Sequence, residues 1–267
     1  MRRILALLDK DLADLRQNPS LFVPAALTGF FSILLPFIVA IIIPTMTGER
    51  LSDSSDFELV VETYASQPAM RDLDPEGVIQ AWVFQHFLVL LVLTPIAGAM
   101  SVAAYSVIGE KQARTLEPLL ATPITTFELL TAKVLGSFLP ALMLSAGCFC
   151  LYVAGVVAFA QPGTYRALFT PGSLGVVFLL GPLSSLVALQ LAVCVSSRVN
   201  DPRSAQQIGA LVILPVAGLL VFQLTGSVVL TVPVILAISL VLLSLSGALM
   251  LLAIKLFDRE AILTRWK

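Results

Sequence analysis

The sequence predicts an all-α integral membrane protein with six transmembrane helices and both termini in the cytoplasm. Three observations support this prediction: the composition, the long stretches without charged residues, and the uneven distribution of lysine and arginine. Of the 267 residues, 58% are hydrophobic and only 12% are charged, and the mean hydropathy is +0.96. Because soluble domains carry about 25% charged residues, this chain has too few charges to cover a globular surface in water.

The uncharged stretches locate the membrane spans, since a transmembrane helix needs about 20 mostly apolar residues. Five stretches lack Asp, Glu, Lys and Arg: 17–48, 77–109, 134–165, 167–197 and 204–254. The last is long enough for two helices, with a turn either at Thr225 to Ser227 or at Thr231 to Pro233. We therefore predict spans at 21–43, 81–108, 134–159, 173–195, 206–225 and 230–254. Prolines at 95, 140, 182, 215 and 233 either let these spans bend or are accommodated passively.

The basic residues orient the spans, because cytoplasmic loops of membrane proteins are enriched in lysine and arginine. With six spans, the N-terminus, the loops 109–133 and 196–205 and the tail 255–267 share one side. That side holds thirteen of the sixteen basic residues, and the other side holds Arg50, Arg71 and Arg166. The sequence therefore predicts that both termini are cytoplasmic and that the acidic segment 44–80 lies outside the cell.

Residues 1–16 form a separate predicted element, ahead of a six-helix transmembrane domain at 17–267. At 100° per residue, one arc of a helix collects five apolar side chains, namely Ile4, Leu5, Leu8, Leu12 and Leu15. The charged residues fall on the remaining surface of the helix. We expect an amphipathic helix that lies on the cytoplasmic surface of the membrane.

Several functional classes are disfavoured by what the sequence lacks. There is no Gly-Lys dipeptide, so the chain has no P-loop for a nucleotide. His86 is the only histidine, so the chain cannot form a zinc motif with two histidines, and any Ser–His pair would have to use His86. No run of basic residues is present to bind a nucleic-acid backbone. We expect no metal, no cofactor in this chain and no enzymatic activity, and we expect Gln190 and Gln223 to form hydrogen bonds between helices.

The most informative stretch is the loop 109–133, which reads GEKQARTLEPLLATPITTFELLTAK. Thr115 can cap a short helix that has Glu117 and Pro118 in its first turn, where both are favoured. Pro123 ends this helix, and Thr125 to Glu128 resembles a capping box that starts the next one. A short, partly apolar helix is thus predicted on the cytoplasmic face. It is either a connector at the lipid interface or a docking helix for a soluble partner.

The string Gly109-Glu110-Lys111, followed by Arg114 to Ile124 and then by Glu128 and Lys133, closely resembles the signature of type-2 permeases of ATP-binding-cassette exporters. Residues Ser197 to Gln207 resemble the loop between the fourth and fifth spans of this family, and Phe257 to Trp266 resembles its C-terminal ending. The resemblance covers essentially the whole chain in length and span order. The loop 109–133 is its specific part.

The resemblance implies that a cytoplasmic coupling helix between spans two and three docks on a separate ATPase, which binds the ATP and Mg²⁺. Two permeases and two ATPases would form the working unit, and the second permease would be either another copy or a related chain. By position, the ATPase-coupling residues would be Glu110, Arg114, Thr115, Leu116, Glu117, Pro118, Leu119, Leu120, Thr122 and Pro123, and the second cytoplasmic loop would contribute Arg198, Asp201 and Arg203.

The resulting hypothesis is the permease subunit of an ATP-driven exporter in the cytoplasmic membrane. An autonomous carrier or channel and a non-transporting membrane scaffold are the alternatives. The predicted spans contain no acidic or basic residue, which disfavours a proton-coupled carrier.

Overall fold

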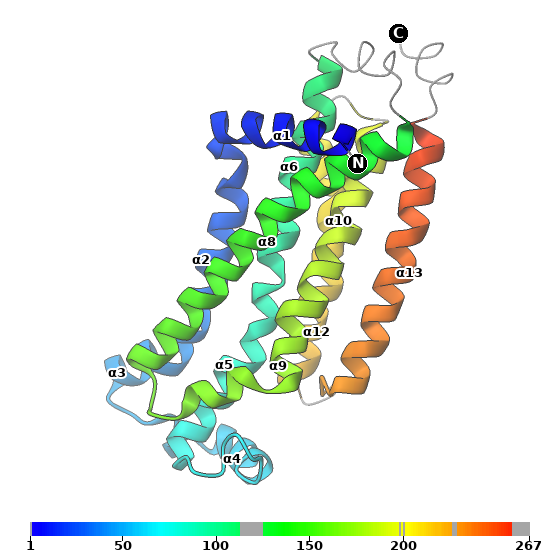
Figure 1. Cartoon of the computed structure of the whole chain (residues 1–267). Helices are drawn as coiled ribbons and strands as arrows, with labels where there is room; N and C mark the ends of the chain where they lie inside the picture. Colours follow the sequence, from blue (N-terminus) through cyan, green and yellow to red (C-terminus); the bar gives the residue numbers. More distant parts are fainter. Residues whose placement is uncertain (1, 113–124, 198, 200, 226–228, 258–267) are drawn as a thin grey trace.

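The computed structural model describes residues 2–112, 125–197, 199, 201–225 and 229–257, and this part of the chain is helical throughout its regular elements, without a strand. Six helices are long and apolar enough to cross a membrane: Pro19–Thr47, Pro75–Glu110, Thr126–Phe159, Pro171–Ser196, Gln206–Leu224 and Val232–Leu256. They run side by side as one bundle (Figure 1). The predicted fold class and span order are therefore confirmed.

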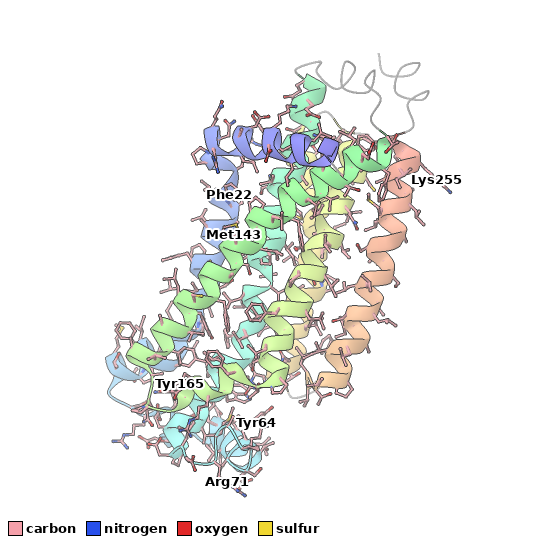
Figure 2. All side chains as sticks on the ribbon, in the orientation of Figure 1. Phe22, Tyr64, Arg71, Met143, Tyr165 and Lys255 are labelled. Carbon is pink, nitrogen blue, oxygen red and sulfur yellow. The ribbon has the colours of Figure 1, made fainter. Side chains whose placement is uncertain are left out.

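Different helices mark the two ends of the bundle. α1 (Arg2–Gln17) lies across one end, where α13 also finishes, and α4 (Glu58–Tyr64) lies at the opposite end (Figure 1). We refer to these as the α1 end and the α4 end. Arg71 and Tyr165 both lie at the α4 end (Figure 2), where Arg166 also forms an exposed ion pair with Asp72 at 3.2 Å.

Most spans consist of more than one helical segment. The first comprises η1 (Pro19–Phe22), α2 (Val23–Phe37), the π-helical η2 (Ile38–Ile42) and α3 (Ile43–Thr47). The second comprises α5 (Pro75–Leu91) and α6 (Leu93–Gln112), and the third is α8 (Thr126–Phe159). The fourth comprises α9 (Pro171–Gly175), the π-helical η6 (Val176–Leu180) and α10 (Gly181–Ser196). The fifth comprises α11 (Pro202–Gly209), η7 (Ala210–Val212) and α12 (Ile213–Leu224), and the sixth is α13 (Val232–Leu256).

Proline explains where several spans change geometry. A proline cannot donate to the carbonyl four residues earlier, and its ring clashes with that carbonyl. The second span breaks at Val92, just before Pro95, and the two π-helical turns precede Pro44 and Pro182. Pro233, in contrast, lies in the first turn of α13, where proline is well tolerated. Pro233 therefore starts a helix, so of the two alternatives for this proline the structure supports passive accommodation.

Side-chain caps begin two of the spans as the sequence predicts. Asp74 caps α5 by accepting a hydrogen bond from the Gly77 N–H at 2.9 Å. Thr125 and Glu128 form a reciprocal capping box at the start of α8. Because α8 starts here, the third span begins eight residues before the predicted position 134. Position 133 belongs to the helix and not to the loop, which corrects the sequence prediction.

The second span is the centre of the bundle. Its apolar window is 89% buried, against 17% for the fifth span and 17% for the sixth. Close approach of α2 to α8 depends on small residues: a Cβ on Gly155 would lie 2.7 Å from the Phe37 ring. The first, third, fifth and sixth spans leave large apolar side chains exposed, as expected for helices whose outer surface faces lipid.

Candidate functional site: an ionic junction at the base of the 109–133 loop

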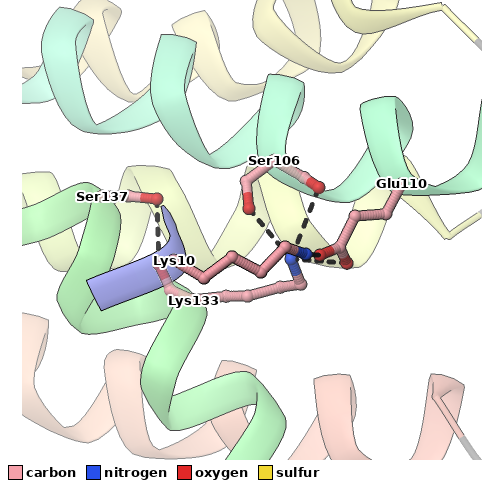
Figure 3. A network of polar contacts seen from close by, with 5 residues as sticks. All are labelled: Lys10, Ser106, Glu110, Lys133 and Ser137. Atoms are coloured by element: carbon pink, nitrogen blue, oxygen red, sulfur yellow. Dashed lines mark hydrogen bonds and ion pairs between the residues drawn. The ribbon is translucent and has the colours of Figure 1, made fainter. Parts of the chain in front are cut away.

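Three elements meet at the α1 end through charged side chains. Lys10 comes from α1, Glu110 from the last turns of α6, and Lys133 from the second turn of α8 (Figure 3). The loop between spans two and three leaves the bundle after α6 and returns at α8. The junction therefore joins the two stems of this loop to each other and to the N-terminal helix.

Glu110 is the centre of the junction. One carboxylate oxygen lies 2.8 Å from the Lys10 Nζ, and the other lies 2.7 Å from the Lys133 Nζ. Lys133 also donates hydrogen bonds to the Ser106 hydroxyl at 2.9 Å and to the Ser106 carbonyl at 3.4 Å. The Ser137 hydroxyl in turn donates to the Lys133 carbonyl at 2.9 Å, which ties this turn of α8 together (Figure 3).

The two ion pairs differ in their exposure to solvent. The Lys133 side chain is 3% exposed and that of Glu110 is 11% exposed, whereas that of Lys10 is 46% exposed. An isolated buried charge costs several kcal/mol, so Lys133 needs its carboxylate partner. The Lys10 pair is closer to a surface ion pair, worth about 0.2–1 kcal/mol. The Glu110–Lys133 pair is therefore the one on which the local structure depends.

Asp11 gives α1 a second charged group at the junction. Burial raises the pKa of its carboxyl, and the nearby Glu110 adds to the rise, while Lys133 and Lys10 oppose it. For Lys10, burial lowers the pKa, but the hydrogen bond and charge of Glu110 outweigh it, so the pKa of Lys10 is raised. Both lysines, Glu110 and Asp11 together nearly balance in charge, as a partly buried cluster requires.

α1 crosses α8 at Gly136, where an added Cβ would make ordinary van der Waals contacts with α1. A Cβ on Gly136 would lie 3.4 Å from the Asp11 Cβ and 3.6 Å from the Leu8 Cδ1. Beside the crossing is an open cavity of about 330 Å³ between α1, α6 and α8, lined in part by Asp14 and Tyr105. The junction is thus a contact among three helices with an adjacent hollow, and it has no groups arranged for covalent catalysis.

Few of the predicted coupling residues fall in the part of the chain that the structure describes. Glu110 does, and its carboxylate is engaged within the chain. Arg114, Thr115, Leu116, Glu117, Pro118, Leu119, Leu120, Thr122 and Pro123 lie outside the described residues, as does Arg198. Their assignment as coupling residues stays a prediction.

The second loop is described at Asp201 and Arg203. Asp201 caps α11, since its carboxylate accepts from the Ser204 N–H and hydroxyl, each at 3.2 Å, and Arg203 is exposed. Val195 at the end of α10 and Val199 in the loop pack against Ala104 and Ile108 of α6. The second loop therefore lies beside the stem of the first one, although no contact joins its described charges to Glu110.

Sequence reasoning missed Lys10 and Lys133 as partners of Glu110. A signal for Lys133 was present, because a helix capped at Thr125 places residue 133 two turns inside α8, next to the membrane. No local pattern connects Lys10 with Glu110, which are one hundred residues apart. Among the described residues, no group of three His, Cys, Asp or Glu side chains is placed to hold a metal ion.

The fold and the junction define a class: a multi-pass, all-α membrane protein in which an ion pair joins the second and third spans at the base of the loop between them. Residues 78–254 match the family model described as ABC-2 family transporter protein. This match covers well over half of the chain, so the protein belongs to the ABC-2 transporter family. No curated protein and no solved structure matches the chain.

Proposed function

We propose that this chain is the permease subunit of an ATP-driven exporter, and that a separate ATP-binding-cassette ATPase docks on the loop between α6 and α8. The observation that supports this most strongly is the Glu110–Lys133 pair, which fixes the two stems of that loop to each other at 2.7 Å. A force applied to the loop would reach both spans together. ATP and Mg²⁺ would be bound by the partner, since this chain has no P-loop.

The transmission would proceed through α6, α8 and α1 as one unit. Lys10 links α1 to the same carboxylate, so the interfacial helix would follow the two spans. Closure of two ATPases on ATP would pull the docked loops, and the gate would open between two permease subunits. The sparsely buried fifth and sixth spans leave apolar surface for lipid or for that second permease, either another copy or a related chain.

The proposed orientation places the α1 end in the cytoplasm and the α4 end outside, following the positive residues. A membrane-impermeant maleimide tests it in intact cells, with the three native cysteines replaced by alanine. Ser54→Cys at the exposed α4 end should be labelled without permeabilisation, and Gln17→Cys at the α1 end only after it. The reverse pattern would overturn the orientation and, with it, the docking proposal.

The spans suggest the kind of substrate. Their few charged residues, namely Glu76, Glu110, Glu128, Lys133 and Lys255, all lie within about two turns of a span end. The middle of the described bundle therefore carries no fixed charge. This supports export of an apolar or amphipathic molecule in preference to a small ion.

The docking proposal is tested by co-purification. Affinity-tagged chain isolated from its native host should carry with it an ATPase that contains a P-loop, identified by mass spectrometry. Leu119→Asp and Leu120→Asp should each abolish this association, because an acid replaces an apolar docking contact. The matched control is Leu59→Asp, which places the same change on an exposed leucine of α4 at the opposite end and should retain the ATPase.

The two alternatives give different results. An autonomous carrier or channel would move substrate in liposomes that contain this chain alone and no ATP. A scaffold would keep its partners and its cellular role after disruption of the 115–122 segment. Retention of the ATPase by both Leu119→Asp and Leu120→Asp would exclude the docking role.

A further inference from the structure

The cavity beside the ionic junction forms where three helices converge. α1 lies across this end of the bundle (Figure 1), and the cavity of about 330 Å³ lies between α1, α6 and α8. Its lining includes Asp11, Asp14, Leu15 and Asn18, which follow one another at helical spacing along α1 and the residue after it. From α6 comes Tyr105, which is 38% exposed. The family membership and the proposed coupling assign no ligand to this cavity.

The charges around this cavity do not balance. Two lysines, Lys10 and Lys133, stand against three carboxylates, those of Asp11, Asp14 and Glu110. Glu110 pairs with both lysines. The carboxylates of Asp11 and Asp14 have no ion pair or hydrogen bond within the described part of the chain. The cavity therefore has an excess of one negative charge and two carboxylates that are open to a cation.

A second, smaller cavity at the α4 end differs in this respect. It has a volume of about 230 Å³, and the described residues that line it, among them Gln85, His86 and Gln223, include no Asp, Glu, Lys or Arg. The buried Oε1 atoms of Gln190 and Gln223 have no hydrogen-bond partner within the described chain, which corrects the expectation that these amides pair with other helices. Only the cavity at the α1 end thus selects a ligand by charge.

The acceptors in the α1-end cavity indicate the chemistry of that cation. Besides the two carboxylates there are the hydroxyl of Tyr105 and the Oδ1 of Asn18, whose Nδ2 donates to the Asp14 carbonyl at 3.2 Å. A primary ammonium group has three N–H donors for such acceptors. A quaternary ammonium has none and is bound by aromatic faces, of which the lining offers one. No three carboxylates among the described residues converge on a metal ion.

The position of the cavity matches the headgroup level of a bilayer. The first span begins at Pro19 and the second ends at Glu110. From Glu110 the cavity extends to Val102, which is about 12 Å along α6 and 2% exposed. The headgroup layer is about 5–8 Å thick on each side, so the charged part lies in it and Val102 lies at the hydrocarbon boundary. At about 30 Å³ per water the cavity holds roughly ten waters, which is room for an aminoethyl phosphate whose acyl chains stay in the bilayer.

We propose that this cavity binds a primary ammonium group, presented by the headgroup of phosphatidylethanolamine or by a soluble alkylamine, with Asp11 and Asp14 as its counter-charges. Burial raises the pKa of the Asp11 carboxyl, so a cation bound beside it would offset the cost of ionising Asp11 in the fold. Binding requires neither ATP nor a partner. Only the further step, that the lipid comes from the cytoplasmic leaflet, rests on the proposed function and its orientation.

Native mass spectrometry of the purified full chain in detergent measures this binding. Dihexanoyl phosphatidylethanolamine should form a saturable adduct. Dihexanoyl phosphatidylcholine has the same tails, phosphate and charges but no N–H donor, and it should bind at least about tenfold more weakly. Ethanolamine separates the two sources: a Kd equal to that of the lipid identifies a soluble amine, and a Kd more than about tenfold higher identifies the headgroup.

Asp11→Asn and Asp14→Asn should each raise the Kd for the ethanolamine lipid by about threefold to tenfold, the loss expected for one charged hydrogen bond in a partly exposed site. The matched control is Asp9→Asn, since Asp9 is an exposed acid of the same helix that does not line the cavity. It should leave the Kd unchanged. Without lipid, Asp11→Asn should melt at the wild-type temperature or above it at neutral pH, so weaker binding would not reflect a damaged fold.

The proposal is overturned if neither the ethanolamine lipid nor ethanolamine gives a saturable adduct, which means that the cavity holds only water. It is equally overturned if the choline lipid binds as tightly as the ethanolamine lipid, or if Asp9→Asn weakens binding as much as the two cavity variants. None of these outcomes affects co-purification of the ATPase. Failure of the ammonium site and failure of the coupling proposal are thus separate results.

Discussion

The junction makes an asymmetric prediction about Glu110 and its two lysines. In Glu110→Gln, Lys133 stays 3% exposed but loses the carboxylate at 2.7 Å, so a buried charge is left without a counter-charge. Breaking a buried pair in this way costs about 3–5 kcal/mol. In Lys10→Met, only a half-exposed pair is lost, and the expected cost is about 0.2–1 kcal/mol. The reasoning therefore predicts a difference of several kcal/mol between two variants of one network.

The double variant distinguishes the ion pair from general disruption. Glu110→Gln/Lys133→Met removes both charges, so it should be more stable than Glu110→Gln alone. Together with the single variant Lys133→Met, the two variants complete a cycle that gives the coupling energy of the pair. Thermal unfolding in detergent is the assay, and for a chain of this size Glu110→Gln should lower the melting temperature by roughly 6–20 °C. Arg166→Met breaks an exposed pair at the α4 end and should cost no more than Lys10→Met. Equal melting temperatures for Glu110→Gln and Lys10→Met would refute the reasoning.

Two further predictions concern α1 and the helix packing. The raised pKa of Asp11 means that the folded protein disfavours the ionised carboxylate. The contribution of Asp11 to stability is therefore fully present at pH values below the pKa of the unfolded chain, near 3.8, and is lost as the pH rises through the pKa of the folded protein. Asp11→Asn should therefore raise the melting temperature at neutral pH but not near about pH 4, and an equal gain at both pH values would contradict this. Gly155→Ala should lower stability by about 1–3 kcal/mol, since its Cβ would meet the Phe37 ring at 2.7 Å. Gly147→Ala, with nothing within 4 Å, should be neutral or slightly stabilising in the same melting assay and is the control.

The membrane fold could be predicted from the sequence because its signals are local. An uncharged stretch of about 20 residues has few alternatives to a membrane span. Asp74 and Thr125 are caps whose partners lie three residues away, so the helix starts at 75 and 126 follow from short patterns. The orientation likewise rests on counting lysine and arginine along the chain.

The candidate sites could not be predicted in the same way, because they depend on residues far apart in the chain. Lys133 was assigned to a loop on the rule that charge marks the end of a span. Its partner Glu110 neutralises that charge, and so the helix extends through it. Gln223 was expected to pair with another helix, yet whether a buried amide meets a partner or a cavity depends on the tertiary packing.

The break in the second span bears on how the junction can act. Glu110 is on α6, whereas His86 and Gln85 at the other cavity are on α5, and the helix is interrupted at Val92 between them. An interrupted helix transmits a displacement less rigidly than a continuous one, since backbone hydrogen bonds are missing at the break. Under the proposed mechanism, α6 can therefore move with the loop while α5 remains packed in the aromatic cluster at the α4 end.

Restoring the helix at this point tests that role. Pro95→Ala supplies an N–H that can donate to the Leu91 carbonyl, so α5 and α6 can join into one continuous helix, and the added hydrogen bond should raise the melting temperature. A more rigid second span should also lower the ATP hydrolysis rate of the purified permease–ATPase complex, since the partner then works against a stiffer element. Pro140→Ala, in the uninterrupted α8, is the control and should leave that rate closer to wild type. If Pro95→Ala stabilises the protein but hydrolysis continues at the wild-type rate, the break contributes to folding geometry alone and the proposed division of the second span into two moving parts is wrong.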